Sequence, residues 1–87
     1  MQAVIVSNST VVLNRVEALL KVHAVESLRL DGHTPESTRG DLVETFNNDK
    51  HTKAFLLSSK AGGTGLNLTG ANRLIHFDPD WYYKKFN

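Results

Sequence analysis

The chain contains no cysteine, which excludes a disulfide scaffold and a cysteine-ligated zinc ribbon. No apolar run reaches the roughly 20 residues that a membrane span needs, and no charged-then-apolar leader opens the chain, so we expect no membrane partner. The formal net charge is only +1, so overall charge gives no argument for binding nucleic acid. Any such binding must depend on particular positions.

Metal-ligand spacing is also missing. The four histidines do not recur at the intervals of a metal site, so no metal site is expected. A chain of 87 residues allows at most one small domain, and 40% hydrophobic with 22% charged residues is typical of a globular fold.

Strand-like and helix-like patterns alternate along the chain. Apolar runs predict strands at 3–8, 27–32, 54–59 and 73–78, and the first, third and fourth are apolar enough to be covered on both faces. Helical spacing predicts a helix over 10–23, which Ser9 or Thr10 could cap, and a helix after Pro35, with Thr34 as its N-cap. Strand–helix alternation implies right-handed crossovers. We therefore predict an α/β fold, with a parallel sheet of about four strands and flanking helices.

A glycine cluster at 62–65 directly follows the third predicted strand. It is not a Walker A loop, because no lysine and hydroxyl follow the second glycine. It begins like a dinucleotide fingerprint, but Leu68 stands where the third glycine belongs, which disfavours a small Rossmann-like nucleotide binder. A tight turn with positive φ stays open. Against a mere turn stand the side-chain donors that follow: Asn67, Thr69 and Asn72.

The stretch SSKAGGTGLNLTGANRLIHFDPDW resembles motif V and the next strand of the Swi/Snf family of superfamily-two DNA translocases, closest to its recombination-repair branch. Upstream, VIVSNST is similar to motif IV, and LRLDGHTPESTRGDLVETFN to the following block. The three blocks occur in the family's order and cover nearly the whole chain. The resemblance implies that residues 1–87 are an incomplete RecA-like lobe of the P-loop-NTPase type, namely part of the second, helicase C-terminal lobe ending before motif VI.

The resemblance also implies functional positions. Contacts to the backbone of double-stranded DNA are expected from Asn8, Ser9, Thr10, His33, Thr34, Ser59, Lys60 and Trp81. A place at the nucleotide cleft, coupling ATP state to DNA grip, is expected for Gly63, Gly65, Leu66 and Asn67. Hydroxyls, N–H groups and one cation can hold phosphates without reading bases, as a translocase requires.

Simpler roles are open at two of these positions, Thr34 and Trp81, and Arg39 has a structural role of its own. Thr34 could cap its helix as readily as contact a phosphate, and it could do both. Arg39 is expected on the helix surface or in a structural ion pair. Trp81 is equally compatible with a half-buried anchor, since Trp often straddles core and surface.

The complete enzymes of this family bind ATP and Mg²⁺ between two lobes and act in the nucleus, so a first RecA-like lobe and a recombinase filament or nucleosome are the implied partners. This chain shows no Walker A lysine and no acidic box, and Tyr82 and Tyr83 replace the family's Asn-Pro. We therefore expect no catalytic residue and no bound cofactor in the chain alone. Because no sheet-covering helix is predicted after the fourth strand, we also expect exposed apolar surface. The alternative is a non-catalytic remnant that binds DNA weakly or binds a protein partner.

Overall fold

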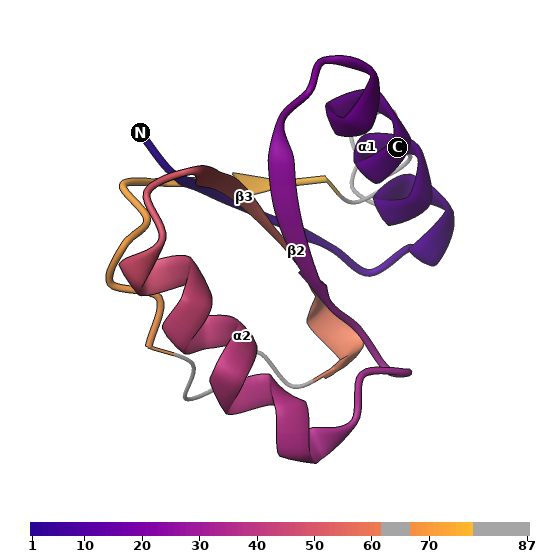
Figure 1. The fold of residues 1–87 in the computed structure, drawn as a ribbon. Coiled ribbons are helices and arrows are strands. Elements are labelled where there is room, and N and C mark those ends of the chain that lie inside the picture. The colour runs from indigo at the N-terminus through magenta and orange to yellow at the C-terminus, as the bar shows by residue number, and fades with distance from the viewer. Residues whose placement is uncertain (62–66, 78–87) are drawn as a thin grey trace.

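The computed structural model describes residues 1–61 and 67–77 (Figure 1). In order, the elements are β1 (Ala3–Ser7), α1 (Thr10–Val22), β2 (Glu26–Leu30), α2 (Glu36–Asn48), β3 (Thr52–Ser58), the 3₁₀ turn η1 (Ser59–Ala61) and β4 (Arg73–His76). The strands form one sheet in the order β2-β3-β1-β4, and each neighbouring pair is parallel. The predicted α/β fold is confirmed. Within the described residues, no helix has the length and apolarity to cross a membrane.

The two helices cover opposite faces of the sheet (Figure 1). On the α2 face, Phe46 packs against Phe55 of β3 with ring centroids 5.3 Å apart in an edge-to-face arrangement. On the α1 face, Leu13 packs with Leu56 of β3. Each of these side chains is fully buried and contributes about 2 kcal/mol through loss of apolar surface from water. As predicted, β3 is covered on both faces.

The ends of α1 have identifiable causes. The Ser9 hydroxyl accepts a hydrogen bond from the Val12 N–H, which confirms a hydroxyl cap at the start of this helix. At the other end the chain reverses through Ala24, whose φ of 56° lies in the left-handed region. The Val25 N–H then donates to the Leu20 carbonyl at 2.8 Å, closing the helix in the manner of a Schellman motif.

The prediction that Thr34 caps α2 is wrong. Pro35 occupies the cap position, and no side chain makes a capping hydrogen bond there. The Thr34 hydroxyl instead accepts from the Asp31 N–H at 3.0 Å and lies 3.4 Å from the Asp31 carboxylate. The hydroxyl is engaged by the preceding turn and does not reach the helix amides.

The prediction that the fourth strand is covered on both faces is also wrong. All four residues of β4 are exposed, with Leu74 72% accessible, because α1 and α2 pack mainly over β1, β2 and β3. Part of the expected exposed apolar surface therefore lies at β4, where Ile75 and Phe77 are also exposed; α1 exposes Val11, Leu19 and Val22 as well. Beside β4, on the α2 face, lies an apolar groove of about 430 Å³, lined by Val4, Val6, Leu57, Leu68, Ala71 and Leu74 among others.

Candidate nucleic-acid interface

Most of the predicted DNA-contact residues lie at one edge of the sheet, where β1, β2 and β3 end. In the strand register Ser7 is paired with Ser58, and Leu30 with Leu57, so the three segments that follow these strands are neighbours. Ligands of open parallel sheets bind outside the carboxyl ends of the strands. We call the end of the sheet at which β1, β2 and β3 finish the carboxyl edge, as distinct from the edge strand β4. It brings together Asn8, Ser9, Thr10, His33, Thr34, Ser59 and Lys60.

Two buried serines shape the chain at the carboxyl edge. The Ser7 hydroxyl accepts from the Ser9 N–H at 3.1 Å, and the Ser58 hydroxyl accepts from the Lys60 N–H at 3.3 Å. Each bond turns the chain directly after its strand. Only Asn8 and Ser9 lie between β1 and α1, and the Ser59 and Lys60 side chains that follow β3 are exposed. The first turn of α1 has no acidic residue, so its positive dipole end is uncompensated by side chains of its own.

The turn at residues 31–34 is fixed around the Asp31 carboxylate. The backbone N–H of His33 donates to the Asp31 carboxylate at 2.9 Å, and the Arg29 guanidinium donates to the same carboxylate at 2.8 Å. The bond from the His33 N–H, together with the bond from Arg29 and its charge, holds the pKa of Asp31 below its ordinary value, although burial opposes this. Arg29 also pairs with Glu17 of α1 at 3.2 Å. This carboxyl-edge turn therefore presents an exposed His33 side chain from a rigid backbone.

A second turn of the same kind lies at residues 49–52, between α2 and β3. The backbone N–H of His51 donates to the Asp49 carboxylate at 3.0 Å, and the Thr52 hydroxyl donates to the same carboxylate at 3.1 Å. The His51 N–H bond is the main cause that lowers the pKa of Asp49. The pattern Asp-x-His-Thr occurs in both segments. That repeated spacing was the signal in the sequence that could have predicted both turns.

The glycine-rich stretch is bounded on both sides by contacts to α2. Arg39 is half-buried, and its Nη1 donates to the Ala61 carbonyl at 2.6 Å; no ion pair of Arg39 occurs among the described residues. Asn67 is exposed, and its carbonyl accepts from Nδ2 of Asn47 at 2.7 Å. Asn67 thus lies beside the last turn of α2, at the other end of that helix from the carboxyl edge. Asn47 was not predicted as a contact residue, and no spacing in the sequence singled it out.

Four predicted positions fall outside the described residues, so the structure gives them no place. These are Gly63, Gly65, Leu66 and Trp81.

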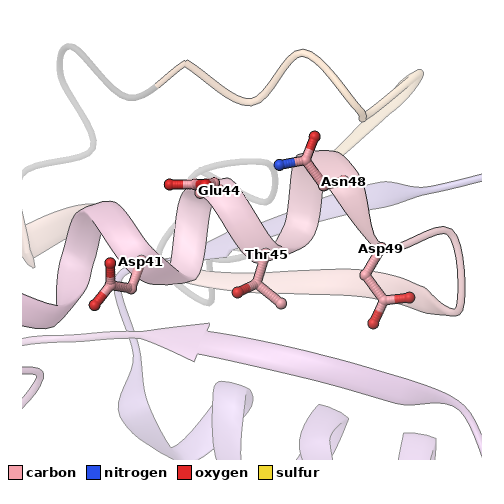
Figure 2. Close-up of a pocket in the computed structure, with 5 residues that line it drawn as sticks. All are labelled: Asp41, Glu44, Thr45, Asn48 and Asp49. Carbon is pink, nitrogen blue, oxygen red and sulfur yellow. The ribbon is translucent and has the colours of Figure 1, made fainter.

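The outer side of α2 contains a hollow of about 570 Å³ (Figure 2). It is lined by Asp41, Glu44, Thr45, Asn48 and Asp49. Three carboxylates would repel a phosphate backbone, and the hollow does not lie at the carboxyl edge. In the described part of the chain, no cluster of three or more His, Asp or Glu residues is suited to a metal ion. The hollow therefore adds neither a DNA site nor a metal site.

A parallel sheet in the order β2-β3-β1-β4, with a helix on each face and a polar carboxyl edge, is the architecture of a RecA-like C-terminal lobe. The chain matches the helicase conserved C-terminal domain over residues 1–87, and it belongs to this family, in its Swi2/Snf2 branch.

Individual relatives agree with this assignment. The chain is 53% identical over 79 residues to the DNA repair protein rhp54 of Schizosaccharomyces pombe, a match that covers 90% of this chain and 9% of that protein. The crystal structure of the C-terminal part of the Fun30 ATPase domain superposes with a TM-score of 0.82 at 43% identity, over 88% of this chain and 25% of the other. The Sulfolobus solfataricus SWI2/SNF2 ATPase C-terminal domain gives 0.76 at 35% identity, over 88% and 34%.

Proposed function

We propose that this chain supplies DNA-backbone contacts and one face of the nucleotide cleft in the second lobe of an ATP-dependent translocase on double-stranded DNA. Residues 1–87 would be part of that lobe, facing a first RecA-like lobe across the cleft. Recombination repair or chromatin remodelling in the nucleus is the proposed setting, with a recombinase filament or nucleosome as partner. The observation behind the proposal is the gathering of small polar side chains and one lysine at the carboxyl edge.

The chemistry of the carboxyl edge suits phosphates. Lys60 is exposed and cationic, Ser59 and Thr10 are exposed hydroxyls, and the start of α1 offers backbone N–H groups. The nearest buried carboxylate, Asp31, is paired with Arg29 and so does not oppose an anion with an unbalanced charge. Such a surface grips a phosphate backbone of any sequence, which is what movement along DNA requires.

The N-termini of α1 and α2 differ in how well they can bind a phosphate. The first turn of α2 contains Glu36, whereas the first turn of α1 contains no acidic residue. A carboxylate at a helix start competes with a bound phosphate for the same positive dipole end. The phosphate nearest Asn8 and Ser9 would therefore be held more firmly than one near the start of α2, where His33 would contribute its side chain and Thr34 the helix N-terminus.

The nucleotide role rests on the family resemblance of the glycine-rich stretch. Gly63, Gly65, Leu66 and Asn67 are the proposed residues, and ATP with Mg²⁺ would be bound by the complete two-lobed enzyme. In the complete enzyme ATP hydrolysis supplies the energy for movement. Because the described residues contain no acidic cluster for a metal ion, we assign none of them to Mg²⁺.

The test uses a chimera of rhp54 in which the matching 79 residues of this chain replace their counterpart. Fluorescence anisotropy with a labelled duplex would give the Kd over a series of salt concentrations. Removing one phosphate contact with Lys60→Ala should weaken binding and reduce the slope of log K against log salt by about 1. Thr34→Ala should weaken binding with little change in slope.

The matched control is Lys50→Ala, because Lys50 is also an exposed lysine but lies in the turn after α2. It should leave both the Kd and the salt slope within experimental error of the unmodified chimera. Equal effects of Lys60→Ala and Lys50→Ala would contradict the proposed DNA face. A chimera that binds DNA but shows no DNA-stimulated ATP hydrolysis would favour the non-catalytic alternative.

A further inference from the structure

Helix α2 contacts the chain on both sides of the glycine-rich segment 62–66. The residue before this segment, Ala61, and two residues after it, Asn67 and Gly70, are all hydrogen-bonded to α2 side chains. These contacts come from two positions only, Arg39 near the start of the helix and Asn47 in its last turn. The described residues on both sides of segment 62–66 are therefore hydrogen-bonded to one helix.

On the N-terminal side of the segment, Arg39 makes a charge-assisted hydrogen bond to the backbone. Nη1 of Arg39 lies 2.6 Å from the Ala61 carbonyl oxygen. Ala61 is itself buried in the core cluster with Phe46 and Phe55, so its carbonyl has a fixed position. Because the guanidinium is half-buried and the donor is ionised, this bond is stronger than a neutral one at the surface.

On the C-terminal side of the segment, the Asn47 side-chain amide makes two hydrogen bonds to the backbone. Its Nδ2 donates to the Asn67 carbonyl at 2.7 Å, and its Oδ1 accepts from the Gly70 N–H at 2.9 Å. Gly70 permits this approach, because a Cβ there would lie 2.6 Å from Oε1 of Gln2 and 3.2 Å from Cα of Asn47. A larger residue could not occupy position 70 without a shift of its neighbours.

The two ties are eight positions apart, which is about 12 Å along a helix axis. The start of α2 follows the carboxyl-edge turn, where DNA contacts are proposed. We infer that Arg39 and Asn47 are positioning residues, which hold the residues on both sides of the glycine-rich segment in fixed positions relative to α2. DNA bound at the carboxyl edge and nucleotide bound near that segment would then both act on the same rigid helix. This inference rests on the proposed function.

The experiment measures coupling in the rhp54 chimera. The readout is the ratio of ATP hydrolysis with saturating duplex to hydrolysis without it. Arg39→Leu and Asn47→Ala should each lower this ratio, and the double variant should lower it about tenfold, within the range of known coupling effects. Arg39→Lys keeps a cation that can reach a carbonyl and should restore part of the ratio. Asn47→Asp keeps the acceptor for the Gly70 N–H but sets a carboxylate oxygen against the Asn67 carbonyl, so it should not restore the ratio.

Matched controls separate positioning from general damage. Asn48→Ala removes the neighbouring exposed amide of α2, and Arg15→Leu removes an exposed arginine of α1; both should keep the ratio. Hydrogen exchange gives a second readout that needs no catalysis. Asn47→Ala should accelerate amide exchange over residues 67–71, with Gly70 affected most, whereas Asn48→Ala should not.

The outcomes distinguish the two claims. If the unmodified chimera shows no DNA-stimulated hydrolysis, the proposed function fails, and hydrogen exchange alone decides whether α2 holds the segment. Unchanged exchange over residues 67–71 in Asn47→Ala overturns the inference. In a DNA-stimulated chimera, a ratio that survives both Arg39→Leu and Asn47→Ala also overturns it, and so does an equal loss in the Asn48→Ala control.

Discussion

Two turns built from the same side chains lie at opposite edges of the sheet. The carboxyl-edge turn (residues 31–34) reads Asp-Gly-His-Thr, and the turn at residues 49–52, which we call the amino-edge turn, reads Asp-Lys-His-Thr. In both, the aspartate accepts from the histidine N–H and lies within hydrogen-bonding distance of the threonine hydroxyl. In both, these bonds lower the pKa of the aspartate.

The surroundings of the two turns differ. The carboxyl-edge turn leads from β2 into α2 and pairs Asp31 with Arg29. The amino-edge turn leads from α2 into β3, and the Asp49 carbonyl accepts from the buried amide of Gln2. One turn borders the proposed DNA surface, and the other borders an internal polar network. Local hydrogen bonding therefore defines each turn, whereas the edge on which the turn lies decides what it can contact.

The largest expected effect tests the amino edge. Nε2 of the buried Gln2 lies 2.8 Å from the Phe46 carbonyl, 3.0 Å from that of Asp49 and 2.8 Å from that of Thr52. Gln2→Leu keeps the volume but leaves buried acceptors unsatisfied, so it should lower the free energy of unfolding by about 3 kcal/mol. Urea unfolding measures the change, with exposed Lys53→Ala as control. A change below that of Lys53→Ala would show that the network is not structural.

The second prediction compares the two aspartates directly. Asp31→Asn removes the charge from a partly buried pair with Arg29 and should cost about 2 kcal/mol of unfolding free energy. Asp49→Asn removes a carboxylate that no arginine or lysine pairs with among the described residues, and it should cost less. Urea unfolding at neutral pH measures both. Equal costs would mean that the Arg29 pair adds nothing.

The lowered pKa values of Asp31 and Asp49 predict that the free energy of unfolding depends on pH. A folded-state pKa below the unfolded value of 3.8 means that each carboxylate stabilises the fold above that value. This contribution is lost as the pH falls through the lower, folded-state pKa. Wild-type unfolding free energy should therefore decline below pH 3.8, and the decline should be shallower in Asp31→Asn. An identical acid profile in both proteins would contradict the assigned cause.

The smallest expected effect compares the exposed histidines of the two turns, His33 and His51. His33→Ala should weaken duplex binding by the rhp54 chimera about threefold, because one polar contact to the DNA backbone is lost. His51→Ala removes the same side chain from the matching turn and should leave the Kd unchanged. Anisotropy titrations at one salt concentration measure both. If His51→Ala weakens binding as much as His33→Ala, the DNA surface is not confined to the carboxyl edge.

Local patterns were sufficient for much of the fold. Apolar runs and helical spacing predicted the four strands and two α-helices of the described residues, because the chain buries β3 on both faces and one face of each helix; the short 3₁₀ turn η1 was not predicted. They failed at Thr34, whose hydroxyl is taken by Asp31, and at β4, whose apolar residues lie at an edge that neither helix covers well. Both errors arise because propensity describes a residue, whereas partners decide what it contacts.

The sequence by itself determined the family, the order of the elements and the residue types that can hold phosphates, since these depend on motifs and periodicities along the chain. Only the tertiary structure decided that segments 8–10, 31–34 and 59–60 meet at one edge, and that Asn67 lies apart from them beside Asn47. The physical reason is that parallel pairing sets side by side the ends of strands that are distant in sequence. A side-chain amide such as Asn47 acquires its role only from the backbone groups that packing brings to it.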